Sequence, residues 1–243
     1  MSKICIVIPF YNESNRIDNE AFLSFLANES DYSLMLVDDG SSDATLSDLQ
    51  NLQSKNPQQI SIFSLTKNAG KAEAVRQGVQ QAWKWKDFDF LGYMDADLAT
   101  PLSEAPYLIS FFSDYHIQFV VGSRIKLYGW NINRSLKRHY FGRIFATYVG
   151  YMFKLEIYDT QCGAKFFTNC LAQDLFKNKF VSKWFFDIEL LLRLRKRMGK
   201  RAFPNSLIEV PLHQWNEMGE SKLRFSDFLK TPFELWKIRR KYQ

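Results

Sequence analysis

The sequence predicts an α/β fold with a mainly parallel sheet flanked by helices, and three observations carry that prediction. Almost continuously apolar, β-branched segments recur between residues 3 and 94, which is typical of strands covered on both faces. Segments with apolar residues at roughly helical spacing separate these strands. A regular alternation of this kind forms a parallel sheet with right-handed crossover connections.

The expected elements follow in chain order. Strands are expected at Lys3–Phe10, Leu34–Val37, Ile60–Leu65, from Phe90, at Phe119–Arg124, after Asp159 and at Ser206–Leu212. Helices are expected around Ile17–Leu26, Ala44–Gln53 with Asp43 as cap, Ala72–Trp85, Leu102–Tyr115 and Trp184–Met198. Phe225–Lys241 is amphipathic and basic, and Pro232 predicts that it forms two helical pieces. No repeat or linker interrupts the chain, so a single domain over residues 1–243 is expected.

The composition narrows the classes of partner and of metal site. The net charge of +6 favours anionic partners such as nucleotides or phospholipid headgroups, but the basic residues are interleaved with too many acidic ones to favour nucleic acid. Three cysteines without C-x-x-C spacing predict neither a zinc site nor a disulfide framework, and they favour a reducing compartment. The oligomeric state stays open.

Membrane contact, if it occurs, is expected to be peripheral. The N-terminal apolar run meets Asn12 and Glu13 at once, so it is expected to be a strand and not a signal peptide. The longest charge-free run near the middle, Ile144–Phe153, is too short to span a bilayer, which needs about 20 residues. Arg134–Phe153 and Phe225–Lys241 combine aromatic and cationic residues, as helices in the headgroup plane do. The alternative is that these aromatic residues pack on the protein's own core.

Polar residues follow each of the first four expected strands. They are Pro9–Glu13, Asp38-Asp39, Asn68–Lys71 and Asp95–Asp97. Ligands bind outside the carboxyl ends of parallel strands, so the topology predicts that these groups meet at one site. Asp95 and Asp97 are two residues apart and would project together from an extended strand end, where a divalent cation removes their mutual repulsion. A solvated acidic turn is the alternative for this pair.

Taken together, these segments resemble the glycosyltransferase family 2 enzymes of the GT-A (Rossmann-like) fold. The matching segments are IVIPFYNES, VDDGSSD, NAGKAEAV, MDADLATP, VGSR and DTQCGAKFF. Within that family the similarity is greatest to the dolichyl- and polyprenyl-phosphate hexose synthases, and DTQCG favours the glucosyltransferase branch. One departure is Ala99, where mannose-transferring members often carry Gln as an additional metal contact.

The resemblance implies a nucleotide-binding half over about residues 1–100 and an acceptor half over about 101–243. Donor nucleotide contacts are implied for Pro9, Tyr11, Glu13, Asp38, Asp39, Lys71, Asp95 and Ala96. A divalent metal, Mg²⁺ or Mn²⁺, is implied at Asp95 and Asp97, and acceptor phosphate contacts at Arg124, Arg134 and Arg138. Asp97, Asp187 and Arg124 are the implied catalytic residues, and Ser221 and Lys222 lie in a loop over the site.

These implied roles are physically reasonable, and each has an alternative. Gly70-Lys71 at a helix start suits phosphate binding through backbone N–H groups, although a solvated lysine is the alternative. Arginine presents a planar fork of donors that matches phosphate oxygens, but a solvated basic face would show the same residues. Asp187 lies on the apolar stripe of its expected helix, where an unpaired carboxylate is costly. It is expected at the floor of the site, as an acceptor-orienting group or a base, unless it merely occupies a helix first turn.

The implied reaction is inverting transfer of a hexose, glucose from UDP-glucose being favoured, to a polyprenyl or dolichyl phosphate. The enzyme would work peripherally at the cytoplasmic face of a membrane. An acceptor phosphate is already an anion, so it needs positioning more than deprotonation. Three alternatives stay open: a GDP-mannose-dependent mannosyltransferase, a transferase acting on a surface-glycan hydroxyl with Asp187 as base, and a nucleotide-sugar-binding module without turnover.

Overall fold

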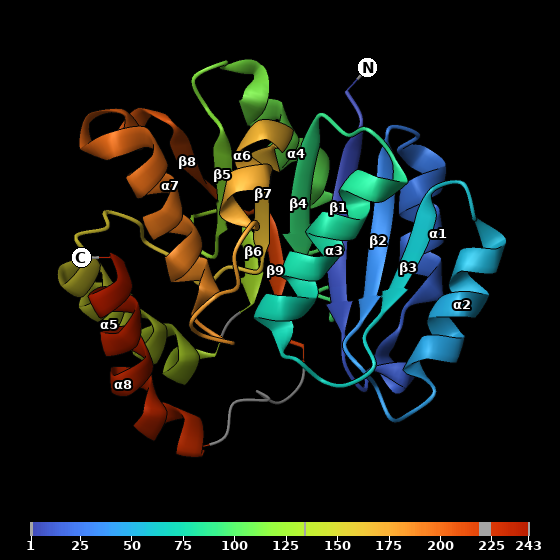
Figure 1. The fold of residues 1–243 in the computed structure, drawn as a ribbon, viewed down its shortest axis with the longest axis horizontal. Helices are drawn as coiled ribbons and strands as arrows, with labels where there is room; N and C mark the ends of the chain where they lie inside the picture. The colour runs from blue at the N-terminus through green and yellow to red at the C-terminus, as the bar shows by residue number, and fades with distance from the viewer. Residues whose placement is uncertain (1, 134, 219–224, 243) are drawn as a thin grey trace.

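A computed structural model describes residues 2–133, 135–218 and 225–242, without the side chains of residues 136–139, 141 and 225–230 (Figure 1). Its main sheet has seven strands in the order β3-β2-β1-β4-β7-β5-β8. The strands are β1 (Ile4–Phe10), β2 (Tyr32–Asp38), β3 (Ile60–Ser64), β4 (Phe90–Met94), β5 (Phe119–Ser123), β7 (Ala164–Thr168) and β8 (Leu207–Pro211). A separate two-stranded sheet pairs β6 (Asn131–Asn133) with β9 (Gln214–Asn216).

The helices cover both faces of the main sheet (Figure 1). They are α1 (Asn19–Asn28), α2 (Thr45–Lys55), α3 (Lys71–Trp85), α4 (Glu104–Ser110), α5 (Leu136–Phe153), α6 (Asn169–Leu175), α7 (Phe186–Ala202) and α8 (Phe225–Tyr242). Short 3₁₀ segments lie at Ser14–Arg16, Phe111–Ser113 and Phe203–Asn205. None of the described helices is both long and apolar enough to cross a membrane.

The sheet is mainly parallel, as the sequence predicts, with one antiparallel strand. β1 pairs in parallel with β2 and β4, and β2 with β3. β7 runs antiparallel between β4 and β5, and β5 pairs in parallel with β8. The carboxyl ends of β1, β2 and β4 therefore lie at the same edge, and β7 starts at that edge beside the end of β4.

Two hydrophobic clusters, one on each face, explain why the strands are apolar almost throughout. Side chains alternate along a strand, so Ile4, Ile6 and Ile8 of β1 belong to one cluster, whereas Cys5 and Val7 belong to the other. The first cluster also takes α1, α2 and α4 residues, and the second takes α3, α6 and α7 residues. Burial on both sides favours continuous apolar runs over an alternating pattern.

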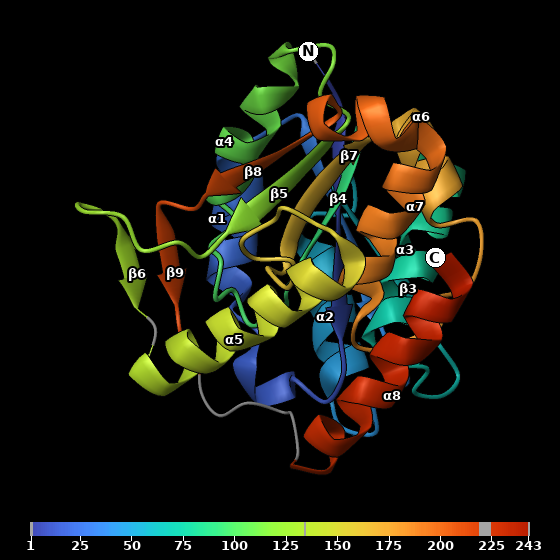
Figure 2. The same ribbon diagram turned by 90° about the vertical axis from the view of Figure 1, so that its left-hand side faces the viewer.

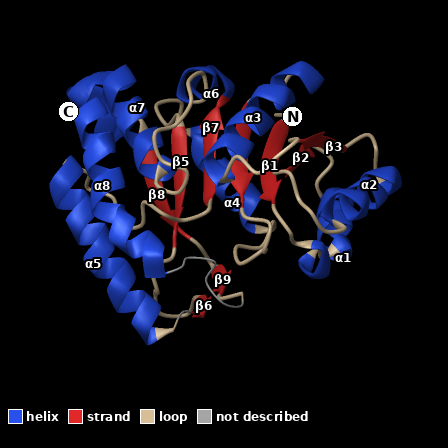
Figure 3. Ribbon diagram, turned by 60° about the horizontal axis from the view of Figure 1, so that its bottom comes forward, coloured by secondary structure: helices blue, strands red, loops and turns tan. Residues whose placement is uncertain are grey.

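Helices α5 and α8 lie beyond the β5–β8 end of the sheet in two views (Figures 1 and 3). A view turned by 90° shows α5 crossing below the ends of β5 and β7 (Figure 2). Of the described side chains, Val149 and Phe153 of α5 and Leu235 and Ile238 of α8 are fully buried in the core. The same helices expose other large apolar groups, so each has one face on the protein and one in solvent.

Several expectations about single elements are wrong. Phe225–Tyr242 is one helix that contains Pro232, not two pieces. Proline removes one backbone hydrogen bond but need not end a helix, and burial of Leu235 and Ile238 anchors the turns that follow it. The helix expected at Leu102–Tyr115 is shorter, because Glu104–Ser110 passes into a 3₁₀ turn. The α7 stripe is wider than expected, since Phe186 to Leu192 are all buried. α6 and the β6–β9 pair were not predicted.

Candidate active site

Asp38 and Asp39, at the end of β2, shape the loops around them. Asp38 is buried, and its carboxylate accepts hydrogen bonds from the Ser41 amide (3.1 Å) and the Ser64 hydroxyl (2.9 Å). Asp39 accepts hydrogen bonds from the backbone amides of Ala69 (2.7 Å) and Gly70 (2.8 Å). Burial raises the pKa of Asp39, and these two amide bonds oppose that rise. The Gly70 N–H, expected to bind phosphate, therefore donates to a carboxylate of the protein.

Asp95, just after β4, forms an ion pair with the first residue of α3. Its Oδ1 lies 2.5 Å from Lys71 Nζ, and both side chains are partly exposed. Burial would by itself lower the pKa of Lys71, but the carboxylates of Asp95 and Asp187 outweigh it and raise that pKa. Gly163 lies directly against Asp95, because a Cβ at Gly163 would come 2.0 Å from Asp95 Oδ2. Only glycine allows this approach between the DTQCG loop and the carboxylate.

Asp97 completes the pair that the sequence places at this strand end. Its Oδ1 accepts a hydrogen bond from the Ala99 amide at 3.0 Å, within a turn in which Leu98 has a φ of 51°. Burial raises the pKa of Asp97, and the neighbouring Asp95 carboxylate raises it further. The structure therefore brings the two carboxylates close enough to interact, as the D-x-D spacing predicts.

These carboxylates fit a divalent ion that is shared with a substrate. Among the described residues, no group of three or more His, Cys, Asp or Glu side chains could hold a metal by itself. Mg²⁺ is usually held by one or two carboxylates together with substrate phosphates, and not by a dedicated protein cage. Two interacting carboxylates, one with its pKa raised by the other, are the donor set that such an ion neutralises.

A second lysine–aspartate pair lies deeper, between β7 and α7. Lys165 is fully buried, and its ammonium donates to Asp187 Oδ1 (2.6 Å) and to the backbone carbonyls of Cys162 (2.6 Å) and Thr160 (3.1 Å). Tyr93 also donates to Asp187 Oδ1. Burial raises the pKa of Tyr93 well above its usual value, and the Asp187 carboxylate adds to that rise. Asp187 is thus a held, paired carboxylate at the floor of the site.

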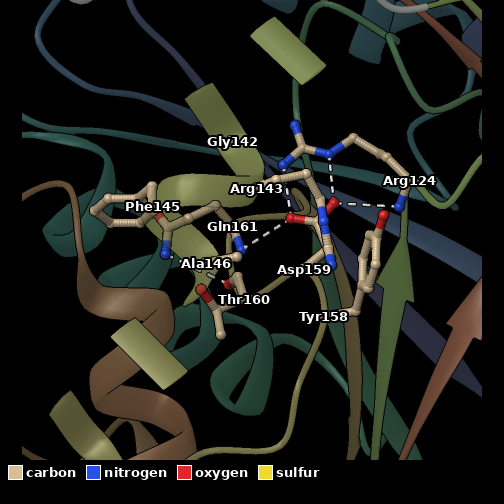
Figure 4. A pocket seen from close by; sticks show the side chains of 9 residues that line it. All are labelled: Arg124, Gly142, Arg143, Phe145, Ala146, Tyr158, Asp159, Thr160 and Gln161. Atoms are coloured by element: carbon tan, nitrogen blue, oxygen red, sulfur yellow. Dashed lines mark hydrogen bonds and ion pairs between the residues drawn. The ribbon is translucent and has the colours of Figure 1, made fainter. Parts of the chain in front are cut away.

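Arg124, at the end of β5, is bound to Asp159 (Figure 4). Its Nε and Nη2 donate to the two carboxylate oxygens at 2.7 and 2.8 Å. Burial opposes ionisation of Asp159, but the Arg124 guanidinium outweighs it and lowers the pKa of Asp159 to about 2. The Glu209 carboxylate accepts from the backbone amides of Tyr158 and Asp159, both at 2.7 Å. The donor fork expected for an acceptor phosphate is therefore engaged by the protein itself.

A small cavity of about 60 Å³ lies between α5 and the loop that begins at Tyr158 (Figure 4). It is lined by Arg124, Gly142, Arg143, Phe145, Ala146, Tyr158, Asp159, Thr160 and Gln161. The Arg143 guanidinium lies 3.7 Å from the centre of the Tyr158 ring. In the described part of the chain, no carboxylate pairs with Arg143. No sequence pattern distinguishes Arg143 from the other basic residues of its segment, and none identifies Lys165.

The structure places some of the remaining predicted site residues, and others lie outside the part that it describes. Pro9 lies in β1, and Tyr11 is 41% exposed just after it. Glu13 is buried, and its amide donates to Thr45 Oγ1 at 2.9 Å. Ala96 lies between the two site carboxylates. Four predictions cannot be placed: Arg134, Ser221 and Lys222 lie outside the described residues, and Arg138 lies in α5 with its side chain undescribed.

Comparison with known proteins gives consistent similarities in sequence and in fold. Residues 5–176 match the family described as glycosyl transferase family 2. The chain is 35% identical to a dolichyl-phosphate beta-glucosyltransferase of Trichomonas vaginalis, over 96% of this chain and 69% of that protein. It is 30% identical to a human dolichyl-phosphate beta-glucosyltransferase, over 99% of this chain and 76% of that protein.

The fold is also found among solved structures. Glucosyl-3-phosphoglycerate synthase from Mycobacterium tuberculosis, solved in complex with Mn²⁺, uridine diphosphate and phosphoglyceric acid, superposes with a TM-score of 0.70. The match covers 98% of this chain and 78% of that one, at 16% sequence identity. At that identity the similarity concerns the arrangement of strands and helices.

Proposed function

Because this chain belongs to glycosyl transferase family 2, we propose that it transfers glucose from UDP-glucose to dolichyl phosphate or a related polyprenyl phosphate. The observation that carries the proposal is the meeting of Asp95, Asp97 and Lys71 at the carboxyl ends of parallel strands. That edge is where ligands bind in such sheets. The names of the dolichyl-phosphate beta-glucosyltransferases that resemble this chain support the choice of sugar and acceptor.

The donor is proposed to lie across the ends of β1, β2 and β4. Pro9, Tyr11 and Glu13 would line the nucleotide side, with Asp38 and Asp39 fixing the loops that enclose it. Asp95 and Asp97 would hold Mg²⁺ or Mn²⁺, which when bound neutralises charge on the leaving diphosphate. A protein of the same fold has been solved in complex with Mn²⁺ and uridine diphosphate, which supports a divalent metal together with a uridine nucleotide. Lys71 lies close enough to these carboxylates to contact the same diphosphate.

The acceptor phosphate would attack the anomeric carbon directly, with inversion. An anionic phosphate needs orientation more than deprotonation, so the protein need not supply a strong base. Asp187 fits a positioning role better than that of a base, because its Oδ1 already accepts from Lys165 and Tyr93. The same observation disfavours transfer to a sugar hydroxyl, a reaction that requires proton removal.

The acceptor phosphate is proposed to approach the cavity beside α5. Arg124 lines that cavity but is engaged by Asp159, so it would hold the loop in place and contribute charge at a distance. Arg143 lines the same cavity with its guanidinium unpaired among the described residues, which makes it a candidate alongside Arg134 and Arg138. Arginine suits this role because its planar donors match phosphate oxygens.

We further propose peripheral binding at the cytoplasmic face of a membrane, where a lipid acceptor keeps its tail. Helix α5 exposes Tyr140, Ile144, Tyr148 and Tyr151, and α8 exposes Phe233 and Trp236. The last turn of α8 carries Arg239, Arg240 and Lys241. Exposed aromatic and cationic groups on one helix favour the headgroup region of anionic bilayers. The free thiols of Cys5, Cys162 and Cys170 suit a reducing compartment.

The reaction is tested by incubating the protein with dolichyl phosphate in detergent, Mn²⁺ and a panel of labelled nucleotide-sugars. Label from UDP-glucose is expected in the organic phase. Label from GDP-mannose alone would make the chain a mannosyltransferase, and label found only in water-soluble glycans would overturn the acceptor class. Asp97→Asn should remove the transfer, whereas Asp87→Asn, at an exposed aspartate, serves as the matched control.

Membrane association is tested by flotation with anionic and with neutral vesicles. Replacing Phe233 and Trp236 with serine should lower binding to anionic vesicles, because both side chains are about half exposed on α8. Tyr115→Ser is the control, since Tyr115 is 83% exposed outside both helices. Wild-type protein that stays with the soluble fraction at low salt would contradict the surface proposal without affecting the transfer assay.

A further inference from the structure

Lys71 occupies the position at Asp95 where a metal ion would need to bind. Its Nζ lies 2.5 Å from Asp95 Oδ1, an oxygen that receives no hydrogen bond of good geometry in addition to this contact. Metal–oxygen distances for Mg²⁺ are about 2.0–2.1 Å. An ion at that distance from Oδ1 would place its charge next to an ammonium, and the two cations would repel each other.

The two oxygens of the Asp95 carboxylate have different neighbours. The Gly163 backbone covers one side of the carboxylate, with Oδ2 as the nearest atom to an added Cβ. Lys71 approaches the other oxygen. A metal ion that binds Asp95 Oδ1 therefore meets the Lys71 ammonium, and one of the two cations must move away.

The ammonium of Lys71 is held loosely enough to move. In the described part of the chain, Asp95 is its single hydrogen-bonding or ion-pair partner, and the Tyr93 and Phe186 rings have their centres 5.9 Å away. The Asp187 and Asp97 carboxylates also stabilise its charge, but neither forms an ion pair with it. The ammonium of Lys165, in contrast, donates to Asp187 and to two carbonyls. The lysine side chain is a flexible four-carbon stem, so a shift of Lys71 needs no backbone movement.

We propose that Lys71 is an exchangeable counter-ion: it neutralises Asp95 in the donor-free enzyme and leaves it when a divalent metal enters with the nucleotide diphosphate. The released ammonium then contacts the diphosphate. A divalent ion and a diphosphate diester carry equal and opposite charge, so their joint arrival leaves the net charge of the site unchanged. Metal alone adds two positive charges beside the ammonium, and it therefore binds weakly until the nucleotide is present.

This inference rests on the proposed function for the identity of the metal site, and its test does not use turnover. Mn²⁺ binding is measured by electron paramagnetic resonance of the free ion, for wild type and for Lys71→Met, with and without UDP. Without UDP, the methionine variant should bind Mn²⁺ at least fivefold more tightly than wild type. With UDP, it should gain less affinity than wild type does, because it has no ammonium whose repulsion of the metal the diphosphate can offset.

Two control variants separate charge from position. Lys71→Arg keeps the cation and should bind Mn²⁺ without UDP as weakly as wild type. Lys84→Met removes an exposed lysine from the same helix and should change nothing. Equal or weaker Mn²⁺ binding by Lys71→Met without UDP would overturn the exchange. Failure of wild type to bind Mn²⁺ even with UDP would instead overturn the metal assignment in the proposed function.

Discussion

Two lysine–aspartate pairs lie in this site, and the difference between them lies in what else each ammonium contacts. Lys165 is fully buried and donates to Asp187 and to two backbone carbonyls, so its hydrogen-bonding capacity is used up. Lys71 is partly exposed and, among the described residues, has Asp95 as its one ion-pair or hydrogen-bonding partner. The two lysines differ in how many of their ammonium N–H donors are already bonded, and not in how close each lies to its aspartate. We expect a fully bonded ammonium to stabilise the fold, and a partly bonded one to remain available to a substrate.

The Lys165–Asp187 pair connects elements that are distant in sequence. Lys165 lies on β7 and Asp187 in the first turn of α7, and Tyr93 on β4 donates to the same carboxylate. Through the carbonyls of Thr160 and Cys162, Lys165 also holds the loop in which Gly163 covers Asp95. The Lys165–Asp187 pair thus fixes the position of the loop that packs against Asp95 of the Lys71–Asp95 pair.

The largest expected effect is a loss of stability when the buried Lys165–Asp187 pair is broken. Lys165→Met should lower the free energy of unfolding by about 3–5 kcal/mol, because Asp187 is left charged, buried and without its cation. Lys71→Met should change it by less than about 1 kcal/mol, because both side chains of the Lys71–Asp95 pair are partly exposed. Urea denaturation measures both. Equal losses in the two variants would show that the number of bonded donors does not distinguish the pairs.

The next effect concerns turnover after a change at Asp97, the carboxylate beside the Lys71–Asp95 pair. Asp97→Asn should lower kcat/KM by about a hundredfold or more, roughly 3 kcal/mol of transition-state stabilisation, since an amide is a poor metal ligand beside a diphosphate. Unfolding in urea should be unchanged or slightly more difficult, because burial and Asp95 already disfavour the charged form of Asp97. A fall in stability that parallels the fall in turnover would make Asp97 a structural residue instead.

A third ion pair, Arg124–Asp159, resembles the Lys165–Asp187 pair because its charged groups are bonded to one another within the protein. From it we expect a pH dependence of stability. The pKa of Asp159 is lowered from 3.8 to about 2 in the folded state, so its contribution is complete above pH ~4 and is lost as pH falls toward 2. The difference corresponds to about 2 kcal/mol. Unfolding free energies measured in urea between pH 5 and 2 should therefore fall less steeply for Asp159→Asn than for wild type. Identical slopes would contradict the prediction.

The smallest expected effect tests the contact between the loop that contains Gly163 and the Asp95 carboxylate. Gly163→Ala would bring a methyl group 2.0 Å from Asp95 Oδ2, so the carboxylate or the loop must shift. Turnover should fall about tenfold, or roughly 1.4 kcal/mol, through a displaced ligand. Gly129→Ala adds a methyl group that meets nothing within 4 Å, and it should leave turnover unchanged. Turnover of Gly163→Ala at the wild-type level would show that the loop does not position Asp95.

Much of the fold follows from local patterns in the sequence. Burial on both faces produces continuous apolar runs, which identify β1, β2 and β4, and the alternation with helices predicts a parallel sheet. The same reasoning brings Asp95 and Asp97 together at a strand end. The antiparallel direction of β7 could not be predicted, because it depends on long-range pairing of Phe166 and its neighbours with β4 and β5.

The ion-pair partners of the charged site residues could not be predicted from the sequence. A carboxylate at position 187 on an apolar stripe predicts that it must be paired, but nothing in the sequence identifies Lys165 as the partner. Likewise, the sequence predicts that Arg124 binds phosphate, whereas in the structure its guanidinium donates to Asp159. Pairing between segments 22 or 35 residues apart is set by tertiary packing. Local patterns carry no record of it.

The placement of β7 also bears on how the chain assembles during synthesis. β5 pairs only with β7 and β8 within the main sheet, although it precedes them by about forty and about ninety residues. Until those segments leave the ribosome, the β4 edge has an unpaired row of backbone donors and acceptors, which is a template for aggregation. The nascent chain therefore has an interval in which the first four strands are assembled but the side of β4 that later pairs with β7 is unpaired, and chaperone binding is expected to matter most in that interval.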